Sequence, residues 1–485
     1  MRTTFSGIEI ARRALQAQQL SLDIVGHNVA NANTPGYSRQ VAVHKASSPY
    51  PAPQFTHNPV NGMIGTGVEI SQISRMRDEF IETRLRHEKH NHNYWQALSD
   101  GLEQVELIFN EPSDSGIHYA LDLFWDSLNE LSKNPENEAT REVVLQRGEV
   151  LAESVRHVRF QLGKLRDNMN GVIDVKVNEI NSIAARIAEL NKQIVKVNVS
   201  GYQPNDLMDK RDELLQELSE IVNIETVCDQ FGAVTVSISG ATIVQRNEVF
   251  TLGVCSSKED VFPNYDRQEV IWQGSNVPAE ITGGELFGII SFRDNEIQDF
   301  ITDLNVWTAN LINEVNSRHE KGYDLNSDPG KAFFTINSSE ADEVSAGDDP
   351  SLTITVNLEN ALEIAASSQL DNGEVVAGNG DIALELASLR NQPVIEGGST
   401  LSQSYNAIIS RLGVKAMEAN NMVNNEEVLV SHLENLRESI SGVSLNEEMA
   451  DMIKFQHAYA AAARIMTAMD QALDTIIYRL GVVGQ

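Results

Sequence analysis

The stretch LNEEMADMIKFQHAYAAAARIMTAMDQALDTIIYRL, residues 445–480, repeats apolar side chains every seven positions, with a second apolar series offset by three. This spacing is typical of a helix with an a/d seam, which buries its apolar stripe against another helix. At 1.5 Å per residue, such a helix is on the order of 50 Å long, which is too long for an element of one small core. The predicted seam residues on this helix are Met452, Phe455, Tyr459, Met466, Met469, Leu473, Ile476 and Leu480.

A shorter seam with the same spacing lies near the other end of the chain. Apolar residues recur there at intervals of seven and at the matching offset. Ser6 and Glu9 have the spacing of a capping box, which predicts where this helix begins. The predicted seam residues on the N-terminal helix are Ile8, Leu15, Leu22, Val25 and Val29.

The N-terminal helix is expected to stop within HNVANANTPGYSRQ, residues 27–40. Asparagine side chains can bond the free backbone groups at a helix end, and a proline excludes the α conformation in the residue before it. A Pro-Gly pair suits a type II turn. We therefore predict a helix-stop turn, after which the chain runs extended, made by Asn31, Asn33, Thr34, Pro35, Gly36 and Tyr37.

The pattern alone leaves two interpretations of the seams. An amphipathic helix at a chain end usually packs into the protein's own core. Alternatively, the seams drive self-association, because each buried apolar side chain contributes roughly 1.5–3 kcal/mol and a long exposed stripe attracts partners. Alanines at positions 458, 460–463, 468 and 472 give the C-terminal helix a second face that another helix can approach closely. We therefore favour self-association.

The middle of the chain is expected to be mainly helical. Apolar residues step by three and four over residues 180–197, 207–221 and 291–319, and residues 119–165 contribute two more helices. A break at Ser200-Gly201 and Pro204 separates the first two of these segments and predicts a helical hairpin. Together these helices are expected to form a bundle.

Two segments change to the alternating pattern of strands. These are VTVSIS, residues 234–239, and LTITVNL, residues 352–358. The predicted fold class is a multidomain α+β protein in which long terminal α-helices pair as a coiled coil, a helical bundle forms a rod domain, and β-rich outer domains are inserted. The predicted domains are a terminal helical polymerisation layer at 1–35 and 440–485, an extended connector at 36–75, a helix-rich rod domain at 76–220, 285–330 and 380–439, a β-rich insertion at 221–284, and a smaller β/loop insertion at 331–379.

Composition limits the classes of partner. The 485 residues are 41% hydrophobic, enough for real cores, and 37 basic against 69 acidic residues give a formal charge of −32. Such a surface repels nucleic acid and anionic membranes. We expect neither a cleaved signal peptide nor a membrane span, so the chain is cytoplasmic or exported by another route. Cys228 and Cys255 are either a pair or two thiols.

No motif supports an enzyme. In HEKHNH, residues 87–92, His87 and His90 share a helix face, but asparagine stands where the zinc-protease pattern needs its second histidine. In DLNSDPG, residues 324–330, Pro329 stands where a calcium loop needs glycine. A solvated helix face and an ordinary loop are the favoured interpretations. We expect no catalytic residues, no cofactor and no metal site.

Several segments resemble the axial-protein family of the bacterial flagellum, whose members bracket the chain with terminal helices. ANANTPGYSRQ, residues 30–40, and GVSLNEEMADMIKFQHAYAAAARIMTAMDQALDTII, residues 442–477, are similar to its N- and C-terminal signatures. The Pro-Gly-Tyr-Ser-Arg ending resembles junction proteins, since rod and hook proteins more often have Thr-Gly-Phe-Lys there. PNDLMDKRDELLQELSEIV, residues 204–222, resembles a segment that rod proteins lack. The resemblance is weakest at 241–282 and 331–380.

This resemblance implies a structural subunit that polymerises at the distal end of the hook and forms the junction to the filament. It implies a helical homo-oligomer that contacts the hook protein and the next junction protein toward the filament. It also implies type III export to the extracellular flagellum and a cytoplasmic export chaperone on residues 440–480. The alternatives are another axial subunit of hook or rod type, which the 204–222 segment disfavours, and a surface-exposed adhesive module that uses the β insertions.

Overall fold

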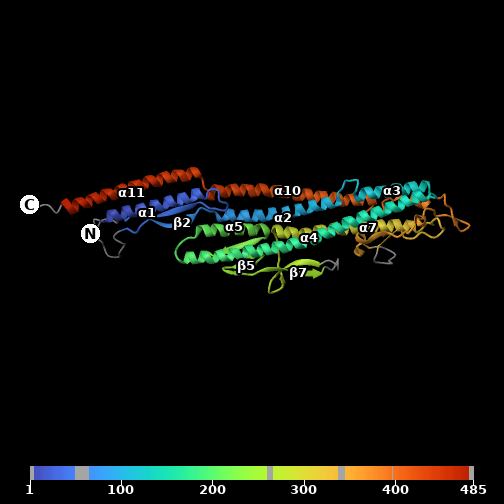
Figure 1. The fold of residues 1–485 in the computed structure, drawn as a ribbon, viewed down its shortest axis with the longest axis horizontal. Helices are drawn as coiled ribbons and strands as arrows, with labels where there is room; N and C mark the ends of the chain where they lie inside the picture. Colours follow the sequence, from blue (N-terminus) through green and yellow to red (C-terminus); the bar gives the residue numbers. More distant parts are fainter. Residues whose placement is uncertain (1–4, 50–64, 259–265, 337–344, 396, 480–485) are drawn as a thin grey trace, which may run out of the picture. The chain divides into compact units, whose positions relative to one another are not determined.

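The computed structural model describes residues 5–49, 65–258, 266–336, 345–395 and 397–479 (Figure 1). The chain divides into two compact units. Unit 1 takes its residues from 1–90, 180–251 and 427–485, and unit 2 from 91–179 and 252–426. The helices that contribute residues to both units are α2 (Glu79–Phe109), α4 (Glu138–Val199) and α10 (Leu401–Ser441).

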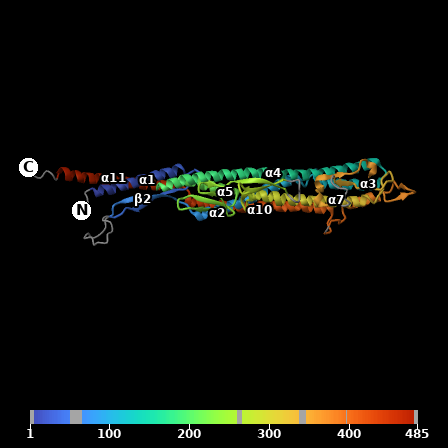
Figure 2. The same cartoon turned by 90° about the horizontal axis from the view of Figure 1, so that it is seen from below.

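Unit 1 holds both terminal helices and two small sheets. Both views show α1 alongside α11 (Figures 1 and 2). One sheet is the antiparallel pair β1–β2, and the other is antiparallel with strand order β3-β4-β5-β6. The elements are α1 (Ser6–Ala30), β1 (Gln40–Ala46), β2 (Val68–Arg75), α5 (Asn205–Ile221), β3 (Ile224–Cys228), β4 (Val234–Ile238), β5 (Ala241–Gln245), β6 (Glu248–Val249) and α11 (Leu445–Arg479).

A buried polar contact joins the four-stranded sheet to α4. The alternation in β4 buries every second residue, as expected for a strand with one covered face. Asn191 on α4 is fully buried; its amide donates to the carbonyls of Val234 and Arg246, and its oxygen accepts the amide of Val234 at 3.0 Å. Arg211 on α5, also buried, donates to the Gly232 carbonyl at 2.6 Å. These bonds satisfy backbone groups that would otherwise be buried without partners.

Unit 2 is a helix-rich body with short strands. A π-helical turn over Phe292–Glu296 connects α6 to α7, and 3-10 turns lie at Ala346–Asp348 and Ala361–Glu363. The remaining elements are α3 (Ile117–Lys133), β7 (Leu252–Lys258), β8 (Asp266–Trp272), β9 (Val277–Pro278), α6 (Gly284–Ser291), α7 (Ile297–His319), β10 (Phe334–Ile336), α8 (Pro350–Thr353), β11 (Ile354–Val356), β12 (Leu370–Asp371), β13 (Glu374–Val375) and α9 (Asp381–Ser388).

Several large aromatic side chains lie in the core of unit 2. Phe124 and Trp125 on α3 are fully buried, and the rings of Trp307 on α7 and Tyr405 on α10 pack with centroids 5.3 Å apart and planes inclined by 52°. The indole of Trp307 donates to the carbonyl of Leu401 at 2.9 Å, so its polar atom is satisfied inside the core.

The predicted fold class is confirmed: long terminal helices pair, most of the chain is helical, and small sheets interrupt it. Several details differ. The second helix of 119–165 and the helix over 180–197 are one 62-residue helix, α4, because its glycines at 148, 163 and 171 do not interrupt the apolar spacing. The segment 221–284 is divided, with residues up to 251 in unit 1 and the rest in unit 2.

The predicted capping box at the first helix is wrong. Phe5 is the N-cap residue of α1 and makes no side-chain capping bond. Glu9 instead bonds Arg12 and Arg13 one turn further along, which lowers the pKa of Glu9 to about 2. Intrahelical ion pairs at these spacings compete with the capping arrangement.

Among the described residues, no helix combines the length and apolarity needed to cross a membrane.

Candidate assembly site

The terminal helices α1 and α11 pack against each other in an antiparallel pair. Near one end, the α-carbon of Gly7 faces Met469 so closely that an added Cβ would lie 2.9 Å from the Met469 sulfur. Near the other end, Asn28 donates to the Glu448 carboxylate at 3.0 Å. Residue numbers rise along α1 as they fall along α11, so the chain ends form a two-helix seam.

On α1, the most buried positions differ from the predicted row. Of the predicted residues, Val25 is buried, whereas Ile8, Leu15, Leu22 and Val29 are half-buried. The reason is that the β1–β2 pair also packs against α1, so the covered stripe is wider than an a/d seam and centred elsewhere. The residues of α1 that are buried are Ala11, Ala17, Ser21, Ile24, Val25 and Asn28.

On α11, the predicted residues form the face toward α1 but are only partly covered. Met452, Phe455, Met466 and Leu473 are half-buried. Tyr459, Met469 and Ile476 remain 40%, 39% and 44% exposed, and Leu480 lies outside the described residues. Ala462, which belongs to the apolar series offset by three, is buried at the centre of this face.

A second apolar face of α11 is open to solvent. Leu445, Met449 and Ile453, which follow one another at intervals of four and so lie on one side of the helix, are each at least half exposed. Large apolar side chains exposed together on one helix face are characteristic of an interaction surface, because each loses favourable burial. We call these three residues the open face.

A buried group of polar side chains lies where α1 ends and α11 begins. Asn28 is 1% exposed and has every hydrogen-bonding position filled: its amide donates to Glu448 and to the Gln40 carbonyl, and its oxygen accepts the Gln40 amide and the Tyr37 hydroxyl. Arg39 donates to Glu448 at 2.6 Å. We call Asn28, Tyr37, Arg39, Gln40 and Glu448 the terminal polar cluster.

Arg39 joins the start of β1 to the start of α11. Its backbone amide donates to the Ser441 carbonyl at 2.9 Å, and its guanidinium pairs with Glu447 at 2.8 Å and Asp451 at 3.6 Å as well as with Glu448. The Glu448 side chain is 2% exposed and that of Glu447 is 64% exposed, so only the Glu448 pair is sheltered from water. No local pattern indicated this pairing, because the partners lie about four hundred positions apart.

The helix-stop turn has the geometry of a type II turn. The Tyr37 amide donates to the Thr34 carbonyl at 3.3 Å, and Gly36, which follows Pro35, has a φ of 74°. Asn31 ends the helix, and its side chain donates to the His27 carbonyl at 3.0 Å. Asn33 is exposed, and its side chain has no hydrogen-bond partner among the residues that the structure describes.

The chain around this turn rests on the N-terminal half of α5. His27 and Gln40 both contact Asp206, at 3.3 and 2.8 Å, and the Ser38 amide donates to Asp209 at 3.2 Å. Burial raises the pKa of Asp209, which the ion pair to Arg75 at 2.7 Å opposes. The 204–222 segment therefore positions the turn, a role that its helical spacing alone did not reveal.

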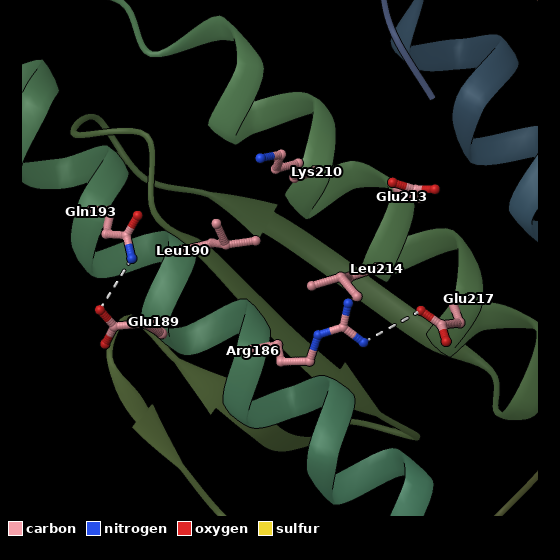
Figure 3. Close-up of a pocket in the computed structure, with 8 residues that line it drawn as sticks. All are labelled: Arg186, Glu189, Leu190, Gln193, Lys210, Glu213, Leu214 and Glu217. Atoms are coloured by element: carbon pink, nitrogen blue, oxygen red, sulfur yellow. Dashed lines mark hydrogen bonds and ion pairs between the residues drawn. The ribbon is translucent and has the colours of Figure 1, made fainter. Parts of the chain in front are cut away.

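An open groove of about 520 Å³ lies between α4 and α5 (Figure 3). Its rims carry charged side chains that bond one another, including Gln193 with Glu189 at 3.2 Å and Arg186 with Glu217 at 4.0 Å. Leu190 and Leu214 lie between the rims. Because the polar groups neutralise one another, this groove offers no convergent set for catalysis or cofactor binding.

The two segments examined as possible metal sites, 87–92 and 324–330, have other structural roles. His87 and His90 stack with ring centroids 4.8 Å apart and planes inclined by only 12°, so their in-plane lone pairs cannot converge on one ion. Asp324 accepts the backbone amides of Asn326 and Asp328 at 2.8 Å, which makes a local turn. Within the described ranges, no three histidine, cysteine or acidic side chains gather as a metal site requires. Cys228 and Cys255 are exposed free thiols.

Comparison with known proteins places the whole chain. Residues 102–334 match the family described as flagellar hook-associated protein FlgK helical domain, and residues 8–37 and 437–478 match the families described as flagella basal body rod protein and flagellar basal body rod FlgEFG protein C-terminal. The solved structure of the flagellar hook junction protein FlgK from Burkholderia pseudomallei has a similar fold, with a TM-score of 0.62 at 16% identity, covering 73% of this chain and all of that one.

Two relatives named flagellar hook-associated protein 1 extend this likeness to the full length. The Salmonella typhimurium protein is 25% identical over 97% of this chain and 99% of its own. The Bacillus subtilis protein is 31% identical over the entire length of both chains. The chain, with its paired terminal helices and helical body, therefore belongs to the flagellar hook-associated protein 1 family.

Proposed function

We propose that this protein polymerises at the distal end of the flagellar hook and forms the junction to which the filament attaches. Its family gives it a structural role in the bacterial flagellum. The observation that carries the proposal further is the open face of α11, three large apolar side chains at least half exposed on a helix whose other face packs on α1.

The open face suits contact with another copy of the chain. Burying each of its side chains would contribute roughly 1.5–3 kcal/mol, so a repeated contact accumulates substantial free energy along a polymer. Contacts between unlike faces of one subunit, repeated by a rotation that does not close, generate a helical tube. In this proposal the terminal helices form the inner layer of the tube, and the β-containing segments face outward.

A strain that lacks this protein tests the junction role. We expect hooks without attached filaments and filament subunit released into the medium, because the filament would lack its attachment site. Electron microscopy and immunoblotting of the medium measure both. Filaments that remain attached to hooks in the deletion strain would refute the proposal.

A pair of substitutions tests the open face directly. Ile453→Glu should leave the helix content unchanged, because Ile453 is 57% exposed, but should prevent assembly by placing a charge in the contact. Gln471→Glu adds the same charge at an exposed position of the same helix, eighteen residues beyond Ile453 and therefore away from the open face, and is the matched control. Filament attachment in a complemented deletion strain is the readout. Equal attachment with both variants would show that the open face is not the contact.

The helix-stop turn is proposed to hold α1 in the orientation that assembly needs. A Pro35→Ala, Gly36→Ala double variant should impair junction formation more than folding, since the turn lies at the end of α1 and contacts α5 through its neighbours. Circular dichroism measures folding, and motility measures the junction. Normal junctions in a strain with this variant would count against the role.

We further propose that the subunit reaches its site by type III export and that a cytoplasmic chaperone covers residues 440–480 beforehand. The open face supports this, because an exposed apolar helix would otherwise associate prematurely. Hook protein and the next junction protein toward the filament are the proposed neighbours after export. If Ile453→Glu protein is retained in the cytoplasm while Gln471→Glu protein is exported, the defect lies in chaperone binding or export and not only in assembly. Equal export of the two would argue against a chaperone contact at this face.

A further inference from the structure

We propose that the buried pair Asn28 and Glu448 sets the register of α1 against α11, that is, which residues of the two helices lie opposite each other. The apolar seam then stabilises the pair without selecting the register. This inference deepens the proposed function, because the register decides how the open face is presented to a second copy.

The apolar contacts of this pair discriminate poorly between registers. From its start to Ser21 the buried positions of α1 carry small side chains, Ala11, Ala17 and Ser21, and only Ile24 and Val25 further along are larger. The Ser21 hydroxyl bonds the Ala17 carbonyl at 2.9 Å and lies 3.2 Å from His44 on β1, so α11 does not satisfy it. The facing side of α11 is rich in methionine, whose flexible side chain fits many surfaces. Sliding by one heptad would place Ala462 or Ile476 opposite Gly7 in place of Met469, and each of these is also apolar.

The polar pair has no equivalent substitute. Asn28 and Glu448 are each 1% exposed and hydrogen-bonded to each other at 3.0 Å. After a slide of one heptad, Asn28 would lie opposite Phe455 or Ser441, and Glu448 would lose its bond from Asn28. A buried charge without its partners is strongly disfavoured, which corresponds to at least about a hundredfold lower population of the shifted register. A single buried asparagine is known to fix register in coiled coils at some cost in stability.

The strand that follows the turn reinforces this choice. Arg39 pairs with Glu448 at 2.6 Å, while its backbone amide is held by the Ser441 carbonyl at 2.9 Å. The Gln40 backbone bonds Asn28 through both its amide and its carbonyl. Asn28 and Glu448 thus both bond the segment formed by Arg39 and Gln40. A slide of α11 would break the bonds between Glu448 and this segment.

Disulfide trapping in the full-length, unassembled protein measures the register. In a Cys228→Ser, Cys255→Ser background, Gly7→Cys with Met469→Cys reports the native register, since the two positions are in contact. Gly7→Cys with Ala462→Cys or with Ile476→Cys reports a slide of one heptad in either direction. We expect the native pair to cross-link at least tenfold faster than either shifted pair.

Glu448→Met is the decisive substitution, because it removes the buried charge and keeps an apolar volume. We expect the rates of the shifted pairs to rise at least tenfold relative to the native pair. Glu447→Met is the matched control, since Glu447 also bonds Arg39 but is 64% exposed; it should leave the rates unchanged. Native cross-linking alone in a helical Glu448→Met protein would overturn the proposal.

A second pair of variants decides the matter if Glu448→Met reduces the helix signal. Asn28→Asp places a carboxylate against that of Glu448 and should lower the rate of native cross-linking at least tenfold. Adding Glu448→Gln restores a donor between the two positions and should recover most of that rate. Failure to recover it in a helical protein would overturn the proposal. Because these assays use unassembled chains, their outcome does not depend on whether the protein forms the junction, so the two proposals can fail separately.

Discussion

His319, at the end of α7, makes unit 2 sensitive to acid. Its side chain is completely buried, and it lies between two backbone groups: Nδ1 donates to the Lys331 carbonyl at 2.5 Å, and Nε2 accepts the Ala365 amide at 2.9 Å. The ring must therefore be neutral. Burial lowers the pKa of His319 to about 4, and the nearby Arg141 guanidinium contributes in the same direction.

The size of the effect follows from the difference between the folded and unfolded pKa values. The unfolded value is about 6.5, so unfolded chains bind more protons than folded ones as the pH falls from 6.5 toward 4. The stabilisation by the neutral ring is complete above pH 6.5 and declines through this window. At about 1.4 kcal/mol for each pKa unit, the total loss is about 3 kcal/mol, of which about 2 kcal/mol is lost by pH 5.

Tryptophan fluorescence during urea denaturation measures the loss of stability of unit 2. All four tryptophans of the chain, at positions 95, 125, 272 and 307, belong to unit 2. Carboxylates also titrate in this range, so the informative quantity is a difference between variants. His319→Gln can keep both hydrogen bonds but cannot gain a charge, so between pH 7 and pH 5 it should lose about 2 kcal/mol less stability than the wild type does.

The control is His157→Gln, which changes an exposed histidine of the same unit. It should retain the wild-type pH dependence. If His319→Gln has the same slope of stability against pH as the wild type, the ring is not held neutral in the folded state and the reasoning fails.

Three further substitutions test the backbone and the buried polar contacts of unit 1. Arg39→Met should destabilise the α1–α11 pair by about 3 kcal/mol, because it leaves Glu448 buried with Asn28 alone; amide hydrogen exchange in α11 should become about a hundredfold faster, and an unchanged rate would contradict this. Gly36→Ala should cost about 1–2 kcal/mol, because Gly36 has a φ of 74°, and a cost near zero in urea denaturation followed by circular dichroism would mean that the turn relaxes. Asn191→Leu should cost about 2–4 kcal/mol by the same measurement, since it leaves backbone groups of the sheet unpaired, and full stability would show that water replaces the amide.

Local spacing was enough to predict the terminal helices, several inner helices and the strand β4. The seven-residue repeat of Met452, Tyr459 and Met466 identified α11, and the Pro35-Gly36 pair identified the turn that Gly36 adopts with its positive φ. These predictions succeed because helical periodicity and turn conformations depend on residues within a few positions of each other.

The partners across the site could not be predicted in the same way. The polar residues Asn28 and Glu448 lie in the two terminal signatures. No local sequence pattern indicates that they bond each other or that Arg39 pairs with Glu448. The residues buried on α1 were predicted only in part. Val25 is buried, but the other predicted residues are half-buried, because the β1–β2 pair covers a second side of the helix where an extended connector was expected.

The sequence by itself thus determined the terminal helices, the stop after α1, several inner helices, the strand β4 and the family to which the chain belongs. Tertiary structure decided which faces are covered, where the chain after α1 contacts α5 through Asp206 and Asp209, and which acidic residue is buried beside Arg39. The physical reason is that periodicity records only that a face is apolar. The desolvation of a charge depends on residues that approach it from distant parts of the chain, and these are fixed only when the whole unit packs.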